Sequence, residues 1–248
     1  MSRAARIIEA IFHHYFSPGD TWVEFERQDI IDAADAVGLG RPGNLGGVIY
    51  RMRYDEMMPE SVAELAPPGL EWVIRGRGSA RYAFSVVEQA WFVPTPGVRA
   101  VEIPDGTPGL VERHRLDDEQ ALLSRIRHNS LVTLATGLAV HSLQTHVRSS
   151  VRNYGQVELD ELYVGLAGNG EEWVLPVEAK AGAGNVSLIQ VEQGSDFCAE
   201  KFPYLPRIPL GAQLVSDDIV IFVFEPIGPG APAGTPVQLA REDRYRLF

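Results

Sequence analysis

The chain has 248 residues, 45% of them hydrophobic, and a formal net charge of −11. This length accommodates one large or two small domains, and the ordinary hydrophobic content excludes an intrinsically disordered chain. The net negative charge argues against nonspecific binding of polyanions. A chain with this net charge can still carry local basic patches that bind a specific polyanion. No apolar run reaches the roughly 18 residues that span a bilayer, and the single Cys198 excludes an intramolecular disulfide. We therefore expect a folded cytoplasmic protein without membrane segments.

The first third of the chain predicts three helices followed by a β-hairpin. Apolar residues at helical spacing predict helices over 2–16, 26–37 and 44–54, separated by glycine- and proline-containing breaks. Alternation over 70–87 predicts a hairpin that turns at 76–79. This order resembles a winged helix-turn-helix domain, which we assign to residues 1–93.

The winged-helix interpretation predicts a DNA-binding face. The third helix would enter the major groove, and the hairpin would contact phosphates or the minor groove. The candidate DNA-binding residues are Asn44, Arg51 and Arg53 on the helix, and Arg75, Arg77 and Arg81 on the hairpin. The alternatives are a small helical domain with a solvated arginine hairpin, and a winged helix that binds protein.

A stretch rich in proline and glycine, 94–115, is predicted to be a linker to a second domain over 116–248. In that domain the pattern predicts, in order, helices over 121–127 and 131–149, an alternating hairpin over 157–164 and 173–180, a helix over 186–199, a fully buried strand over 217–226 and a closing strand over 237–248. Arg148 and Arg152, just before the hairpin, are candidates for phosphate contacts or for salt bridges to the neighbouring acidic strand.

The hairpin carries charged residues where buried strands are usually apolar. Glu158 and Asp160 share one face of the first strand, and Glu178 and Lys180 share one face of the second. Antiparallel pairing of matched faces would bring Asp160 close to Glu178 and Lys180. Two carboxylates with an amine beside them form a candidate site for a hard cation.

Asp160, a spacer of seventeen residues, Glu178-Ala179-Lys180 and a following helix with Gln190 together resemble the PD-(D/E)xK nuclease superfamily. This is the fold of many restriction endonucleases, and the resemblance covers roughly residues 116–226. The chain departs from the family pattern at Leu159, where proline often stands. The resemblance implies an α/β (α+β) fold with a restriction-endonuclease-like central mixed sheet flanked by helices, beside the small winged-helix domain.

The resemblance also implies roles for individual residues. Asp160, Glu178 and the Ala179 carbonyl would ligate Mg²⁺, for which Mn²⁺ would substitute, and Glu158 would be a further ligand. Lys180 would orient or activate the attacking water, and Gln190 would position Lys180 or a water.

On this basis we expect a metal-dependent endonuclease that acts on double-stranded DNA, with a Type II restriction enzyme as the first interpretation. Cutting both strands of a duplex requires two active sites, so we expect a homodimer. A DNA repair or structure-specific nuclease is the alternative among enzymes. A non-catalytic DNA-binding regulator on a nuclease fold is the alternative of another class.

Overall fold

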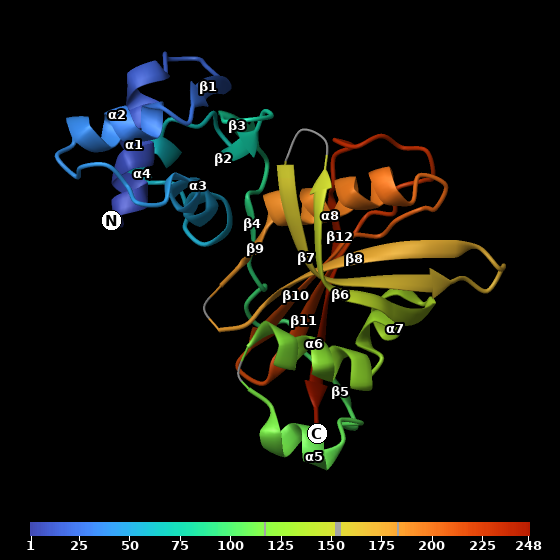
Figure 1. Ribbon diagram of the computed structural model, residues 1–248. Helices are drawn as coiled ribbons and strands as arrows, with labels where there is room; N and C mark the ends of the chain where they lie inside the picture. The colour runs from blue at the N-terminus through green and yellow to red at the C-terminus, as the bar shows by residue number, and fades with distance from the viewer. Residues whose placement is uncertain (117, 152–154, 183) are drawn as a thin grey trace. The chain divides into compact units, whose positions relative to one another are not determined.

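Figure 1 shows the computed structural model of the protein, which describes residues 1–116, 118–151, 155–182 and 184–248. The chain divides into two compact units, one containing Met1–Trp91 and the other containing Phe92–Val151 and Gln156–Phe248. Each unit has a hydrophobic core of its own. Among the described helices, none combines the length and apolar character that crossing a bilayer requires.

The first unit combines helices with a three-stranded sheet. Its elements are α1 (Arg3–Tyr15), β1 (Trp22–Glu26), α2 (Asp29–Ala36), α3 (Leu45–Tyr54), α4 (Glu60–Ala63), β2 (Glu71–Gly76) and β3 (Arg81–Val87), with sheet order β1-β3-β2. The three predicted helices and the predicted hairpin are present. Strand β1 was not predicted, because it is short and buries only Val23 and Phe25.

The core of the first unit is centred on α1. Phe12 is fully buried. Its ring makes T-shaped contacts with Trp72 on β2 and with Phe84 on β3, and the ring centroids of each pair are 5.1 Å apart. Such perpendicular aromatic contacts add to the stabilisation that burial of the rings provides. The helix and the hairpin are therefore held together by aromatic packing.

The second unit is a mixed α/β structure around a seven-stranded sheet with the order β5-β12-β11-β10-β8-β7-β6. Its strands are β5 (Val101–Ile103), β6 (Ala139–Val151), β7 (Gly155–Leu166), β8 (Glu172–Lys180), β10 (Leu210–Val215), β11 (Asp218–Phe224) and β12 (Leu239–Leu247). Strand β8 pairs in parallel with β10, and β5 with β12, whereas the β7–β8, β10–β11 and β11–β12 pairs are antiparallel. A short separate sheet pairs β4 (Trp91–Phe92) with β9 (Val186–Ser187).

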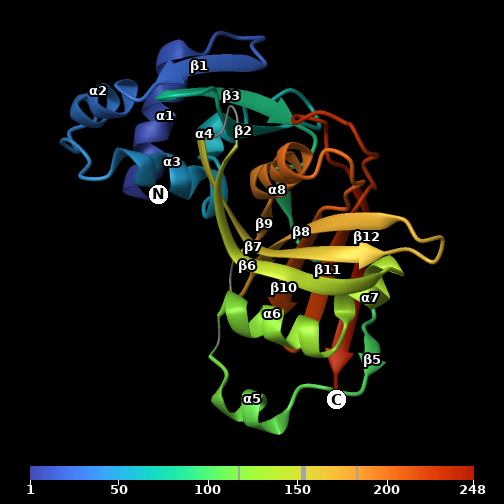
Figure 2. The ribbon, with the colours of Figure 1, turned by 45° about the vertical axis from the view of Figure 1, so that its right-hand side comes forward.

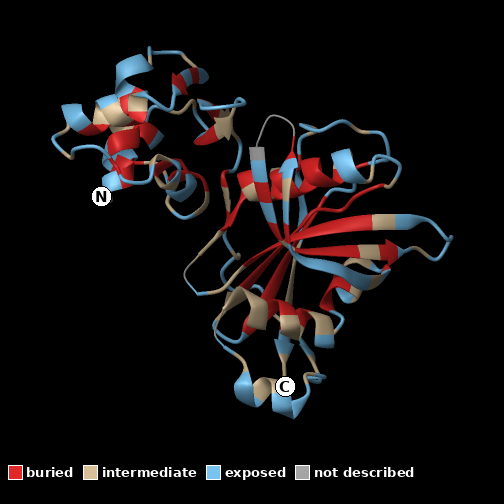
Figure 3. Cartoon of the chain, in the orientation of Figure 1, coloured by how far each residue is buried: buried red, intermediate tan, exposed pale blue. Residues whose placement is uncertain are grey.

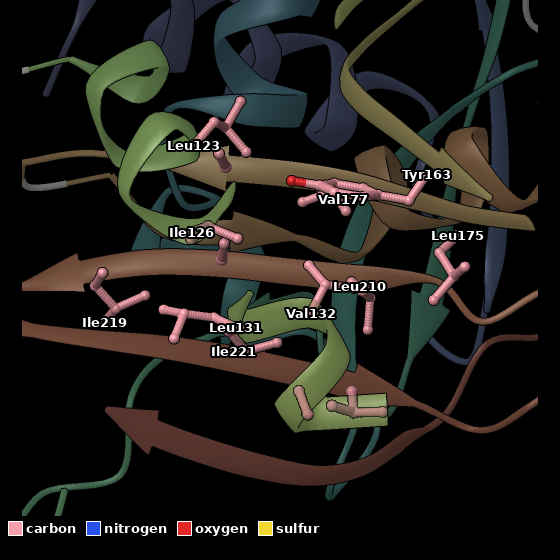
Figure 4. Close-up of a cluster of buried hydrophobic side chains, with 14 of the residues drawn as sticks. Leu123, Ile126, Leu131, Val132, Tyr163, Leu175, Val177, Leu210, Ile219 and Ile221 are labelled. Atoms are coloured by element: carbon pink, nitrogen blue, oxygen red, sulfur yellow. The ribbon is translucent and has the colours of Figure 1, made fainter. Parts of the chain in front are cut away.

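Helices cover both faces of this sheet, which confirms the predicted mixed sheet flanked by helices. On one face, α6 (Glu119–His128) and α7 (Leu131–Thr136) pack on a cluster that includes Leu175 and Val177 of β8 (Figure 4). On the other, α8 (Leu188–Lys201) lies along β8 (Figure 2). A Cβ added at Gly194 of α8 would lie 3.0 Å from Pro176 Cβ, so the glycine permits this close approach.

The prediction of one helix over 131–149 is wrong. Helix α7 ends at Thr136, because Gly137 adopts the left-handed conformation with φ 73° that commonly terminates helices. The chain then continues as β6, at the end of the sheet. Only Val147 and Val151 of this strand are buried, so its sequence lacks the alternating apolar pattern of a half-buried strand.

The predicted linker over 94–115 contributes regular structure to the second unit. It contains β5, whose Val101 pairs with Tyr245 of β12, and the short helix α5 (Gly109–His114). Proline and glycine correctly indicated turns in this stretch. They did not reveal the strand, because β5 is only three residues long and pairs with the far end of the chain.

Gly211 provides a test of the packing beside β8. It lies opposite Glu178 in the β8–β10 pair, and a Cβ added there would lie 2.9 Å from Val186 Cγ1 on β9. We expect Gly211→Ala to lower the free energy of unfolding by about 1–3 kcal/mol, because a valine methyl close to the backbone cannot swing aside. Urea unfolding of the variant, measured with circular dichroism, gives this quantity.

The control for this prediction is a double-mutant cycle with Val186→Ala. Removing the valine methyls makes room for the new Cβ, so the double variant should lose less stability than the sum of the two single losses. Strictly additive losses would contradict the proposed contact.

Candidate active site

The pairing of β7 with β8 places Asp160 next to the Glu178-Ala179-Lys180 segment. The antiparallel register runs from Glu161 opposite Val177 to Leu166 opposite Glu172. Asp160 precedes this regular register, and its Oδ2 accepts a hydrogen bond from the Ala179 N–H at 2.8 Å. The side chain of Asp160 is thereby attached to the backbone of the neighbouring strand.

Glu178 is the centre of the site. Its side chain is only 5% exposed, and its Oε1 lies 2.8 Å from Lys180 Nζ. The same oxygen accepts a hydrogen bond from Nε2 of Gln190, which projects from α8. The structure thus brings Asp160, Glu178, Lys180 and Gln190 together from three different elements.

Burial and repulsion by nearby carboxyl groups disfavour the charged forms of Asp160 and Glu178. Burial and the nearby Asp160 raise the pKa of Glu178 from 4.5 to about 8, although Lys180 opposes the rise. Burial also raises the pKa of Asp160, against the effects of the Ala179 N–H and of Lys180. Lys180 alone therefore does not offset the charge that both carboxyl groups would carry if they were ionised together.

Two further residues act on this site and were not predicted. Glu119, the first residue of α6, raises the pKa of both Asp160 and Glu178, and its Oε1 accepts from the Ala181 N–H at 3.3 Å. His146 on β6 is close enough for its charge to oppose the rise in the pKa of Asp160. An acidic residue at a helix start is ordinary capping chemistry, so the sequence offered no signal that Glu119 approaches the hairpin.

The donor set fits a hard divalent cation. A cation would neutralise the carboxylates of buried Glu178 and partly buried Asp160, whose pKa values are raised. Gln190 Oε1 is buried without a hydrogen-bond partner among the described residues, so it can accept from a bound water. Across the described ranges, no group of three His, Cys, Asp or Glu side chains is assembled as a metal site. The carboxylates would therefore be supplemented by the Ala179 carbonyl and by water, which is the common arrangement for Mg²⁺.

Glu158 does not join this group. Its Oε1 lies 3.0 Å from Arg148 on β6, in a solvent-exposed ion pair. Val157 and Leu159 are buried and Glu158 is exposed, so the expected alternation of β7 holds here, but the side chain of Glu158 pairs with Arg148. Glu158 therefore stands apart from the other predicted metal ligands in this structure, and Arg148 makes a salt bridge, which is one of the two roles predicted for this arginine. Arg152 lies outside the described residues.

The predicted recognition helix α3 exposes fewer of its candidate residues than expected. Asn44 is the N-cap of the helix, and its Oδ1 accepts from the Gly47 N–H at 2.9 Å. Arg53 is only 9% exposed, which corrects its assignment to a DNA-binding face. Arg51 remains exposed and lies 3.5 Å from Glu56. Tyr50, which is 54% exposed on the same helix, was not predicted.

The arginines of the hairpin have acidic or polar neighbours. Arg77 and Arg81 are exposed, and each lies 3.9 Å from a glutamate of β1, Glu24 and Glu26 respectively. The two arginines and the two glutamates line a cavity of about 470 Å³. Arg75 donates from Nε to Ser85 Oγ at 3.1 Å. The positive charge of the hairpin arginines is thus partly offset by the carboxylates of β1 in the same unit.

Comparison with known proteins finds no matching family model, curated protein or solved structure. The chemistry available to the site is therefore that of its own side chains. Two buried carboxylates, a lysine and a glutamine amide form a compact group that can bind a cation and order a water beside it.

The raised pKa of Glu178 predicts a pH dependence of stability in metal-free protein. Between pH 4.5 and about 8 the folded state retains a proton on Glu178 that the unfolded chain has released. The free energy of unfolding should therefore fall as the pH rises through this window, by at most about 1.4 kcal/mol per pH unit from this group. Glu178→Gln should remove that part of the decline, measured by urea unfolding in EDTA.

The matched control is Glu172→Gln, at the exposed start of the same strand. This variant should keep the wild-type decline with pH. Equal slopes for wild type and Glu178→Gln would contradict the raised pKa.

Proposed function

We propose that the protein is a Mg²⁺-dependent endonuclease that hydrolyses phosphodiester bonds at specific sites in double-stranded DNA, as a Type II restriction enzyme does. The observation that carries this proposal is the convergence of Asp160, Glu178, Lys180 and Gln190 in one partly buried group. This group unites ligands for a hard cation with an amine and an amide that can order water.

Asp160 and Glu178 would hold the metal with the Ala179 carbonyl, and Mn²⁺ would substitute for Mg²⁺ there. When bound, the metal lowers the pKa of a water and neutralises charge on the phosphate. The ammonium of Lys180 donates a hydrogen bond to the attacking water and holds it in line with the phosphorus. Gln190 donates a hydrogen bond to Oε1 of Glu178 and thereby restrains this carboxylate. The other carboxylate oxygen, Oε2, is then held in a fixed orientation.

The first unit is proposed to be a winged helix that binds the duplex. Its order of elements and the exposure of Arg51, Arg77 and Arg81 support this role. The acidic partners of these arginines weaken the attraction for phosphates, which is the observation that favours protein binding instead. Cleavage of both strands requires two catalytic groups, so the acting form is proposed to be a homodimer.

Charge neutralisation on β1 distinguishes the two roles of the first unit. Replacing Glu24 and Glu26 together by glutamine releases Arg77 and Arg81 from their acidic partners. If the hairpin contacts phosphates, we expect roughly 3–10-fold tighter binding and a steeper dependence of binding on salt, measured by fluorescence anisotropy of a labelled duplex. The control removes two equivalent charges at the β7–β8 turn, with Glu171→Gln and Glu172→Gln.

Unchanged affinity in the β1 variant, or the same gain in the control, would contradict DNA binding by the hairpin. Protein binding would then be the better interpretation of the first unit.

The enzyme proposal is tested with the two lysines of the chain, Lys180 and Lys201. Wild type incubated with a long unmodified duplex in Mg²⁺ should produce discrete fragments. Lys180→Ala should cut about 10²–10⁴-fold more slowly, because the group that orders the water is lost. Lys201→Ala, in which an exposed lysine is removed from the end of α8, should cut at the wild-type rate.

The products identify the class of nuclease. A smear in place of discrete bands would indicate a repair or degradative nuclease. Binding without cleavage in either Mg²⁺ or Mn²⁺ would refute the enzyme proposal for duplex DNA and favour a non-catalytic DNA-binding regulator.

A further inference from the structure

The charge of this chain is distributed unevenly around the site. The sequence contains 33 acidic residues, yet it has no aspartate or glutamate between Glu119 and Glu158. The structure folds this acid-free stretch into most of α6, α7 and the whole of β6. A strongly acidic chain therefore carries an acid-free strand next to its candidate catalytic group.

Strand β6 is open to solvent to an unusual degree. It ends the strand order of the sheet, and all its residues from His141 to Thr145, and His146 after them, are exposed (Figure 3). Since successive side chains point to opposite faces, both faces of this part of the strand are uncovered. Proteins commonly protect such an edge with lysine, proline or an inward-pointing charge, and this stretch has none of them.

The exposed side chains are of the types that contact nucleic-acid backbones. Gln144 and Thr145 offer neutral hydrogen-bond donors, and His141 adds an imidazole. Arg148 follows further along the strand, where it is exposed beside Glu158. Hydroxyl, amide and basic side chains supply most protein contacts to phosphate oxygens.

The strand leads to the candidate active site. His146 has a φ of 47°, a left-handed conformation that is uncommon for a residue other than glycine and that breaks the regular strand. It lies on the strand that neighbours β7, which carries Asp160. On the preceding part of β6, Ser142 donates a hydrogen bond to Glu161, the neighbour of Asp160 in β7. A chain lying along β6 would therefore arrive beside Asp160.

We propose that β6 is the surface along which a DNA backbone lies on its way to Asp160 and Glu178. This inference rests on the proposed nuclease function and adds the path of the substrate to it. Charge favours a polyanion over a second copy of this chain as the occupant. Edge-to-edge pairing of two β6 strands would bring like histidines and arginines together, whereas the acid-free strand has no carboxylate to repel a phosphate.

The first test adds negative charge to the strand. Gln144→Glu with Thr145→Glu should weaken binding of a fluorescent duplex of about 40 base pairs, which spans several helical turns, when anisotropy is measured in EDTA. We expect a loss of about tenfold or more and a shallower salt dependence. The control adds the same charge away from β6, with Val101→Glu on β5 and Gln238→Glu before β12, both at exposed positions, and should bind as wild type does.

The second test locates the DNA directly. Because the single native Cys198 is buried, a cysteine introduced at Thr145 can be labelled selectively with a photoreactive maleimide. Irradiation should cross-link Thr145→Cys protein to the duplex, whereas protein labelled at Gln238→Cys should give no adduct. Thermal unfolding and circular dichroism of every variant exclude misfolding as the cause of a loss.

The outcomes separate this inference from the nuclease proposal. Wild-type affinity in the β6 variant, or no cross-link from position 145, overturns the β6 path even if wild type cuts DNA. Cross-linking of one protein chain to another at this position overturns it in favour of a second copy. A cross-link to DNA from a protein that cuts nothing supports the β6 path while refuting the nuclease proposal.

Discussion

The constraint on which the second unit depends is the placement of two carboxylates, buried Glu178 and partly buried Asp160, beside a single lysine. Taking Glu178 and Asp160 out of water is costly unless each oxygen finds a partner. The structure provides Lys180 and the Gln190 amide for Glu178, and the Ala179 N–H for Asp160. The raised pKa values of both carboxyl groups indicate that these partners do not fully offset burial, and a bound cation would offset the remainder.

The packing of the fold serves this arrangement. Gly194 lets α8 approach β8, and this approach brings Gln190 within reach of Glu178. Gly211 lies opposite Glu178 in the parallel β8–β10 pair and makes room for Val186. Small residues at both positions allow the elements that carry the site to lie close together, so changes in packing there should also affect the geometry of the carboxylates.

Local charge has more bearing on function here than net charge. A total of −11 would disfavour binding to DNA if it were spread evenly, but the stretch from α6 through β6 has no acidic residue after Glu119. In the first unit the arginines of the hairpin are instead paired with glutamates of β1. The proposed enzyme would thus meet DNA through an acid-free strand and a partly neutralised hairpin, and its affinity should depend on a few specific contacts.

The sequence by itself determined α1, α3, the hairpin of the first unit, the β7–β8 pair and buried β11, because each shows its own periodicity or turn within a short window. It also pointed to Asp160, Glu178, Lys180 and Gln190 as one group, and the structure brings these side chains together. Only the tertiary structure decided that β6 and β5 are strands, that Arg53 is buried, that Glu158 pairs with Arg148, and that Glu119 approaches the site. These features depend on partners distant in the chain, and no local pattern of residues encodes which distant segment will lie beside them.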